Sequence, residues 1–202
     1  MEVRTGKTLT ALGAAEKLGI KSLLFVTKKK AISSIDADFN KLKPTYDITI
    51  INYESLHKVR INQPNTFDLI VLDEAHTLGA YPKPSKRAKL VKEIILKQNP
   101  YVILMSGTPT PESFSQMYHQ VYACPKSPFK QYVSFYKFAK DYVNVVQRVI
   151  NSFHINSYDD GKPAILDEMK PFMISYTQKE AGIKSEIKEH ILKVQMSELI
   201  YN

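Results

Sequence analysis

Four short apolar runs, separated by segments with helical spacing, constrain the fold of this chain more than any other feature. Each run is four residues long and rich in β-branched or large apolar side chains; they cover residues 23–26, 48–51, 69–72 and 102–105. Continuous apolarity over so few residues is typical of strands buried on both faces of a parallel sheet. Segments with helical spacing lie at 9–18, 31–42 and 86–97. The alternation predicts an α/β fold: a mostly parallel sheet with helices on both faces, and ligand sites beyond the carboxyl ends of the strands.

The last third of the chain has a different pattern. From about residue 126 to residue 150, apolar side chains recur every three or four positions, which predicts one or two amphipathic helices. Residues 156–163, which include Asp159-Asp160-Gly161, are typical of a loop or turn. Residues 172–176 and 187–194 are predicted as late strands. The aromatic and basic side chains from Phe129 to Arg148 could stack on bases or pack in a core, and their helical spacing favours the core.

Composition limits the classes of function. Of the 202 residues 44% are hydrophobic, which excludes a disordered tail. No apolar run approaches the roughly 20 residues that span a bilayer, and the first residues lack the apolar stretch of a secretory signal. We therefore expect no membrane partner and a cytoplasmic protein, in the host cytoplasm if a phage encodes it. The single cysteine, Cys124, cannot form an internal disulfide or a thiolate metal cluster.

Positive charge is concentrated near the N-terminus. The chain carries 28 Lys and Arg against 20 Asp and Glu, a net charge of +8; residues 1–60 hold 11 basic and 6 acidic side chains, which is +5 of that excess. This balance indicates a polyanionic partner. Lys28-Lys29-Lys30 is open to two interpretations, a contact with nucleic-acid phosphate or a solvated helix start. A second basic cluster, at 83–89, is interpreted as a solvated helix face.

Gly6-Lys7-Thr8 opens the first helical segment. In a phosphate-binding loop, backbone N–H groups at a helix N-terminus surround the phosphates, the lysine reaches the β and γ phosphates, and the hydroxyl binds Mg²⁺. Met1 stands where the usual pattern has its first glycine. The triplet alone is therefore a weak signal, and it needs a second motif.

Two more motifs follow buried runs. Asp73, directly after the run at 69–72, is placed to hold Mg²⁺, and Glu74 is placed to orient or deprotonate an attacking water. The alternative is a strand-end turn with solvated acids, which the spacing to Lys7 disfavours. Ser106-Gly107-Thr108-Pro109 follows the run at 102–105, and its small residues permit a sharp turn close to bound phosphate.

Residues 2–8, Asp73-Glu74-Ala75-His76 and Ser106-Gly107-Thr108-Pro109 together resemble motifs I, II and III of superfamily 2 helicases. The resemblance is strongest to the Swi/Snf-type branch, including its phage and bacterial members with an Asp-Glu-Ala-His motif. Residues 23–27 resemble motif Ia, and residues 50–56 resemble motif Ib. The resemblance implies a RecA-like P-loop NTPase domain, the N-terminal lobe of a nucleic-acid-dependent ATPase. Such a DNA helicase or translocase uses ATP and Mg²⁺ and acts on double-stranded DNA.

The resemblance also implies roles for individual residues. Hydrolysis would use Lys7, Asp73 and Glu74, and Mg²⁺ would be held by Thr8 and Asp73. The nucleotide would be contacted by Arg4, Thr5, Gly6, Lys7 and Thr8. Motif III would be coupled to the ATP site through His76, Ser106, Gly107 and Thr108. Nucleic-acid contacts would come from Thr27, Lys28, Asn52, Tyr53 and Ser55.

The sequence departs from the family pattern at both ends. The family has a strand directly before motif I, whereas this chain begins inside the motif, and a second lobe with an arginine finger would follow residue 202. We therefore expect one lobe: an ATP-binding core at 1–125, a C-terminal part of helices and strands at 126–195, and at 196–202 the start of a linker to the missing second lobe. Because an arginine finger contributes roughly 10³–10⁵ to the rate in GTPases, this lobe alone is expected to be a weak ATPase.

Two alternatives to this function remain open. One is a non-catalytic module that binds nucleotide or DNA without hydrolysis. The other is the motor part of a type I or type III restriction enzyme.

Overall fold

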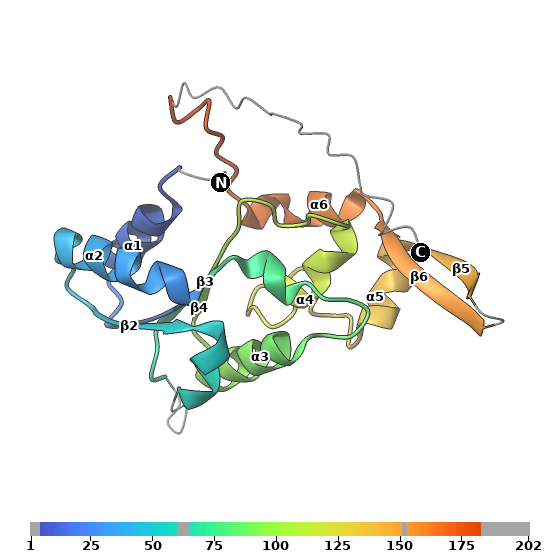
Figure 1. Ribbon diagram of the computed structural model, residues 1–202, viewed down its shortest axis with the longest axis horizontal. Coiled ribbons are helices and arrows are strands. Elements are labelled where there is room, and N and C mark those ends of the chain that lie inside the picture. Colours follow the sequence, from blue (N-terminus) through green and yellow to red (C-terminus); the bar gives the residue numbers. More distant parts are fainter. Residues whose placement is uncertain (1–4, 60–64, 151–152, 183–202) are drawn as a thin grey trace, which may run out of the picture.

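The computed structural model describes residues 5–59, 65–150 and 153–182. Within these residues a parallel sheet of four strands has the order β2-β1-β3-β4 (Figure 1). The strands are β1 (Ser22–Thr27), β2 (Asp47–Asn52), β3 (Leu69–Asp73) and β4 (Tyr101–Met105). All three pairings are parallel. The predicted α/β sheet and its four strands are confirmed. The prediction that the strand before the phosphate loop is lacking stays a prediction, since residues 1–4 lie outside the described residues.

Helices cover both faces of the sheet, as predicted (Figure 1). Helices α1 (Lys7–Lys17) and α2 (Ile32–Leu42) pack on one face, and α3 (Lys86–Gln98) packs on the other. Successive side chains of a strand point to opposite faces. Leu23 and Phe25 of β1 therefore meet α1 and α2, whereas Leu24 and Val26 meet α3. Among the described helices, none has the length and apolarity needed to cross a membrane.

The prediction that all four strands are buried on both faces is correct only for the two central ones. Every residue of β1 from Leu23 to Thr27 is buried, and so are the first four residues of β3. Strand β2 has no buried residue and consists of exposed and half-buried ones, and Tyr101 at the start of β4 is 63% exposed. Strands β2 and β4 lie at the edges of the described sheet, where the helices cover them less completely.

The register between β1 and β3 is set at their amino ends. Leu23 pairs with Leu69, and the pairing continues to Val26 with Leu72. The carboxylate of Asp68 accepts hydrogen bonds from the backbone N–H groups of Lys21, at 2.8 Å, and of Ser22, at 3.1 Å. This contact holds the two strands in one alignment, so the residues that follow them also come side by side.

The C-terminal part differs from its prediction in three places. Helix α5 (Phe135–Tyr142) ends at Tyr142, and the chain continues as strand β5 (Val143–Ile150), not as a helix. Strand β6 (Phe153–Gly161) pairs antiparallel with β5 and includes residues that we predicted as a loop. The predicted strand at 172–176 is also wrong, because a 3₁₀ helix (Lys170–Phe172) is followed there by irregular chain. The strand predicted at 187–194 lies outside the described residues.

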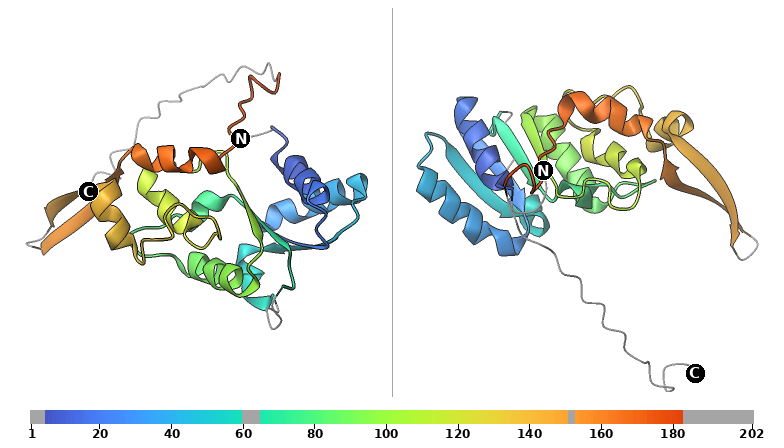
Figure 2. Two further views of the ribbon diagram at one scale, coloured as in Figure 1. Left: turned by 180° about the vertical axis from the view of Figure 1, so that it is seen from behind. Right: turned by 90° about the horizontal axis from the view of Figure 1, so that it is seen from above.

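The β5–β6 hairpin forms from a segment whose apolar spacing also suits a helix. The segment from Val143 to Ile150 is rich in β-branched residues, which favour strands, but the same residues also recur at helical spacing. Two contacts keep the turn-forming Asp residues inside β6: Asn144 donates to Asp160 at 3.0 Å, and Tyr81 donates to Asp159 at 2.9 Å. Figure 2 shows that the hairpin extends away from the rest of the molecule.

Aromatic side chains form the core of the C-terminal part. The ring of Phe138 is fully buried, and its centroid lies 4.9 Å from that of Tyr118, 5.0 Å from Phe129 and 5.1 Å from Tyr142. Helices α4 (Met117–Val121) and α6 (Ala164–Met169) pack against the same cluster. Phe129 and the buried face of α5 therefore serve the core, as predicted, whereas Arg148 lies on the exposed hairpin. The division at residue 125 stays a prediction, and the linker at 196–202 lies outside the described residues.

We expect Phe138→Ala to lower the free energy of unfolding by roughly 3–5 kcal/mol, because it removes a fully buried ring and leaves a cavity. The matched control is Tyr136→Ala on the same helix, where the ring is 46% exposed and the loss should be about 1 kcal/mol. Urea unfolding followed by circular dichroism measures both. Equal losses would contradict the position of Phe138 at the centre of this core.

Candidate functional site

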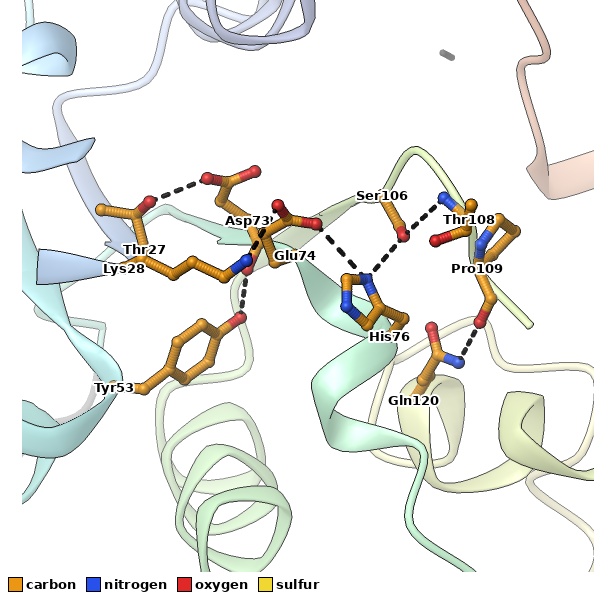
Figure 3. Close-up of polar contacts among 10 residues, drawn as sticks. All are labelled: Thr27, Lys28, Tyr53, Asp73, Glu74, His76, Ser106, Thr108, Pro109 and Gln120. Atoms are coloured by element: carbon orange, nitrogen blue, oxygen red, sulfur yellow. Dashed lines mark hydrogen bonds and ion pairs between the residues drawn. The ribbon is translucent and has the colours of Figure 1, made fainter. Parts of the chain in front are cut away.

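The carboxyl edge of the sheet gathers the predicted motifs. Strands β1, β3 and β4 are parallel, so Thr27, Asp73 and Met105 end at the same edge. Helix α1 packs on the sheet and leads through a short connection into β1, so its N-terminus lies at this edge as well. Figure 3 shows the polar contacts that connect the ends of the strands.

The N-terminus of α1 has the features of an anion site. Gly6 is the N-cap, with φ of 79° in the left-handed region that favours glycine, and no side chain caps the first turn. The first turn carries no acidic residue that would repel an anion. The positive end of the helix dipole lies at Gly6, and a Cβ at this glycine would meet no atom of the described residues within 4 Å apart from its chain neighbours. Thr5 is buried and Lys7 and Thr8 are half-buried beside it, whereas Arg4 lies outside the described residues.

Asp73 is held from two directions (Figure 3). The hydroxyl of Thr27 donates to its Oδ2 at 2.7 Å, and the hydroxyl of Tyr53 donates to its backbone carbonyl at 2.7 Å. Burial is the main cause that raises the pKa of the Tyr53 hydroxyl, and the nearby Asp73 carboxylate raises it further. The hydroxyl therefore stays protonated and continues to donate. The position of Asp73 is therefore fixed before any ligand binds.

Glu74 begins a network that crosses the sheet edge. Its backbone adopts the left-handed conformation (φ 51°, ψ 44°), uncommon outside glycine, and turns the chain sharply after β3 into a 3₁₀ helix, η3 (Ala75–Leu78). Its Oε1 lies 3.1 Å from Lys28 Nζ, and its Oε2 lies 3.3 Å from His76 Nδ1. His76 Nδ1 is also 3.0 Å from Ser106 Oγ. Motif II therefore contacts motif III through one imidazole.

The loop after β4 is also held at Pro109, by Gln120. Ser106 Oγ accepts from the backbone N–H of Thr108 at 3.2 Å, which tightens the turn. Gln120 Nε2 donates to the Pro109 carbonyl at 2.6 Å. Sequence reasoning missed Gln120, which is only 5% exposed; it is one of two polar residues in α4, with His119, and no sequence pattern distinguished it. His76 and Gln120 thus contact this loop at two points, Ser106 and Pro109 (Figure 3).

Two of the five predicted nucleic-acid contacts are wrong. Thr27 is 0% exposed and Tyr53 is 5% exposed, so neither side chain can reach a nucleic-acid backbone, and both support Asp73 instead. Lys28 is exposed, and Asn52 and Ser55 are half-buried. The Asn52 side chain accepts from the backbone N–H of Ser55 at 2.7 Å and so caps the segment that begins with Tyr53. Contacts from Lys28, Asn52 and Ser55 stay predictions.

We predicted Arg87 as part of a solvated helix face, but in the structure it also contacts Tyr53 and Glu54. Its guanidinium carbon lies 4.8 Å from the centre of the Tyr53 ring, and Nη2 is 2.8 Å from Glu54 Oε1. Arg87 therefore covers the tyrosine that supports Asp73, and it connects α3 to the site.

The sheet order, the helices on both faces and the motifs at one edge define a RecA-like α/β domain. A sequence profile of the SNF2-related domain matches residues 16–201, and the chain therefore belongs to the SNF2-related domain family. The predicted Swi/Snf-type superfamily 2 membership is confirmed; the narrower phage or bacterial subgroup stays a prediction. The matched range begins after Gly6-Lys7-Thr8, so it adds nothing to the assignment of those three residues.

Comparison with solved structures supports the fold. The chain is similar to the Sulfolobus solfataricus SWI2/SNF2 ATPase core in complex with double-stranded DNA, with 22% sequence identity and a TM-score of 0.55. The match covers 70% of this chain and 33% of that chain, so this chain spans about one third of that ATPase core. No curated protein sequence matches the chain.

We expect Thr27→Val to lower the free energy of unfolding by roughly 1–2 kcal/mol, because the Asp73 carboxylate loses a donor and faces a methyl group instead. Thr27→Ser is the matched control, since it keeps the hydroxyl and should cost less. Chemical denaturation of the three proteins measures the difference. If valine and serine cost the same, the hydrogen bond contributes nothing and only the volume of the side chain matters.

Proposed function

We propose that this chain is the N-terminal ATP-binding lobe of a DNA-dependent ATPase, a helicase or translocase that couples hydrolysis to movement on DNA. One observation carries the proposal. The uncapped N-terminus of α1, the Asp73-Glu74 pair and the contact between His76 and Ser106 all lie at the carboxyl edge of one parallel sheet. Membership of the SNF2-related domain family supports it.

The triphosphate of ATP binds at the start of α1. The N–H groups of the first turn, which no side chain caps, receive phosphate oxygens, and Lys7 neutralises the β and γ phosphates. Arg4 and Thr5 add contacts on the loop side of Gly6. Glycine suits this position because its backbone is left-handed and no side chain stands between the helix and the phosphate.

The residues at the edge fit a Mg²⁺ ion. Thr8 and Asp73 would be the protein ligands of this ion, with its remaining ligands from phosphate and water, which is the usual arrangement for Mg²⁺. The ion would supply positive charge beside the phosphates during transfer. The hydrogen bond from Thr27 keeps the Asp73 carboxylate in one orientation.

Glu74 accepts a proton from the attacking water. It is the carboxylate one residue beyond Asp73, and its side chain is about one third exposed, so water can reach it. His76 connects this carboxylate to Ser106 and hence to Gly107 and Thr108. A change at the phosphate site can therefore reach the motif III loop, and through it a second lobe.

DNA binding and the second lobe complete the proposal. The chain carries a net charge of +8, and the structurally similar SWI2/SNF2 ATPase core was solved with double-stranded DNA. We place the DNA backbone near Lys28, Asn52 and Ser55. A second lobe supplies the arginine finger, closes on ATP and reopens after hydrolysis, and each cycle advances the protein along the DNA.

We expect Lys7→Ala to abolish ATP binding, and Glu74→Gln to keep binding but lower hydrolysis by roughly 10²–10⁴, the usual contribution of a general base. Fluorescent-nucleotide titration measures binding and phosphate release measures hydrolysis, for this chain and for a two-lobe protein, each with and without duplex DNA. Lys17→Ala, at the exposed far end of the same helix, is the matched control.

The outcomes separate the alternatives. Unchanged hydrolysis in both variants contradicts the site. ATP binding without hydrolysis in the two-lobe protein favours a non-catalytic module. DNA-stimulated hydrolysis supports a motor, and a nuclease motif in the neighbouring coding sequence would favour the restriction enzyme.

A further inference from the structure

Lys28 and Glu74 are neighbours because of the sheet register. Residues of β1 pair with residues of β3 that lie 46 positions later, from Leu23 with Leu69 to Val26 with Leu72. The same offset continues beyond the last pairs of the ladder. It brings Thr27 to Asp73 and then Lys28 to Glu74, where Nζ and Oε1 are 3.1 Å apart.

The ion pair with Lys28 involves the Glu74 carboxylate, which is the group proposed to accept a proton from water. Lys28 holds Oε1 of Glu74, and His76 Nδ1 lies 3.3 Å from Oε2, so both oxygens have a partner (Figure 3). Oε1 is the atom that would have to face the attacking water, and Lys28 Nζ lies against it. While the pair lasts, Lys28 stands between this oxygen and water.

Lys28 also faces solvent, where a second anion can reach it. Its side chain is 59% exposed, and Lys29 and Lys30, which follow it, are exposed too. Among the described residues, Lys28 is the member of this run with an ion-pair partner. A polyanion attracted by the three lysines would therefore compete with Glu74 for one of them.

We propose that Lys28 is a positioning residue that transmits nucleic-acid binding to Glu74. This inference rests on the proposed function, since it takes Glu74 as the base and nucleic acid as the partner. Without nucleic acid, Lys28 holds the Glu74 carboxylate in an ion pair. When nucleic acid binds, one of its backbone phosphates pairs with Lys28 in place of Glu74. Glu74 Oε1 then becomes accessible to water, and hydrolysis accelerates only on nucleic acid.

Linkage allows a test that needs no ATP. If phosphate and Glu74 compete for Lys28, then removing the charge of Glu74 must strengthen nucleic-acid binding, and it must do so through Lys28. An exposed ion pair of this kind is worth up to about 1 kcal/mol, so Glu74→Gln should tighten binding about two- to fivefold. If Glu74 instead weakened binding only by repelling DNA phosphates, Glu74→Gln would tighten binding equally with and without Lys28.

The experiment measures binding of a labelled DNA duplex by fluorescence anisotropy, at one fixed salt concentration and without nucleotide. Omitting nucleotide excludes the phosphates of ATP as the competing anion. Glu74→Gln is compared with its parent in three backgrounds: the unchanged chain, Lys28→Ala and Lys30→Ala. Lys30→Ala is the matched control, because it removes the same charge from the same exposed run. We expect the gain in the unchanged chain and in Lys30→Ala, none in Lys28→Ala, and its return in Lys28→Arg.

The possible failures are distinguishable. If the unchanged chain binds neither duplex nor single-stranded DNA, the nucleic-acid partner of the proposed function is wrong, and this inference falls with it. If DNA binds but Glu74→Gln has no effect, or has the same effect in Lys28→Ala, the inference alone is wrong. Because Lys28 is a solvent-facing residue, its variants should remain folded, which circular dichroism verifies.

Discussion

The pairing of β1 with β3 is the interaction on which the site depends. Both strands are buried, and Asp68 holds their amino ends together through the backbone of Lys21 and Ser22. A slip of one residue would turn every side chain of a strand to the opposite face, and tight packing against helices on both faces opposes it. The same register places Thr27 beside Asp73 and Lys28 beside Glu74. The core therefore determines the chemistry at the edge.

Two adjacent carboxylates at the edge of a sheet repel each other, and the structure compensates in different ways for each. Asp73 accepts a hydrogen bond from the Thr27 hydroxyl at its carboxylate and one from the Tyr53 hydroxyl at its backbone carbonyl, so it is held in a fixed orientation. Glu74 turns away in a left-handed conformation and meets an exposed lysine and a histidine. A fixed carboxylate suits a metal ion, whereas a carboxylate with exchangeable partners suits proton transfer. This difference between neighbouring acids supports their separate proposed roles.

Much of the fold was predictable because its signals are local. Each central strand is a short apolar run, each helix has its own spacing, and the Asp-Glu pair directly follows a buried strand. The hairpin was not predictable, because Val143 to Ile150 satisfies both helical spacing and strand propensity, and in the structure this segment pairs with β6. Thr27 and Tyr53 were misassigned for a related reason. A hydroxyl near a strand end suits a surface contact or a buried support equally well, and only burial distinguishes the two.

The sequence by itself determined the α/β class, the order of the four parallel strands and of the helices between them, and the residues proposed for a phosphate and metal site. These follow from patterns within a few residues of each other. Only the tertiary structure decided which of those residues meet: Lys28 with Glu74, His76 with Ser106, Gln120 with Pro109 and Arg87 with Tyr53. Such pairs lie 11 to 46 positions apart along the chain, and the packing that unites them belongs to the fold as a whole.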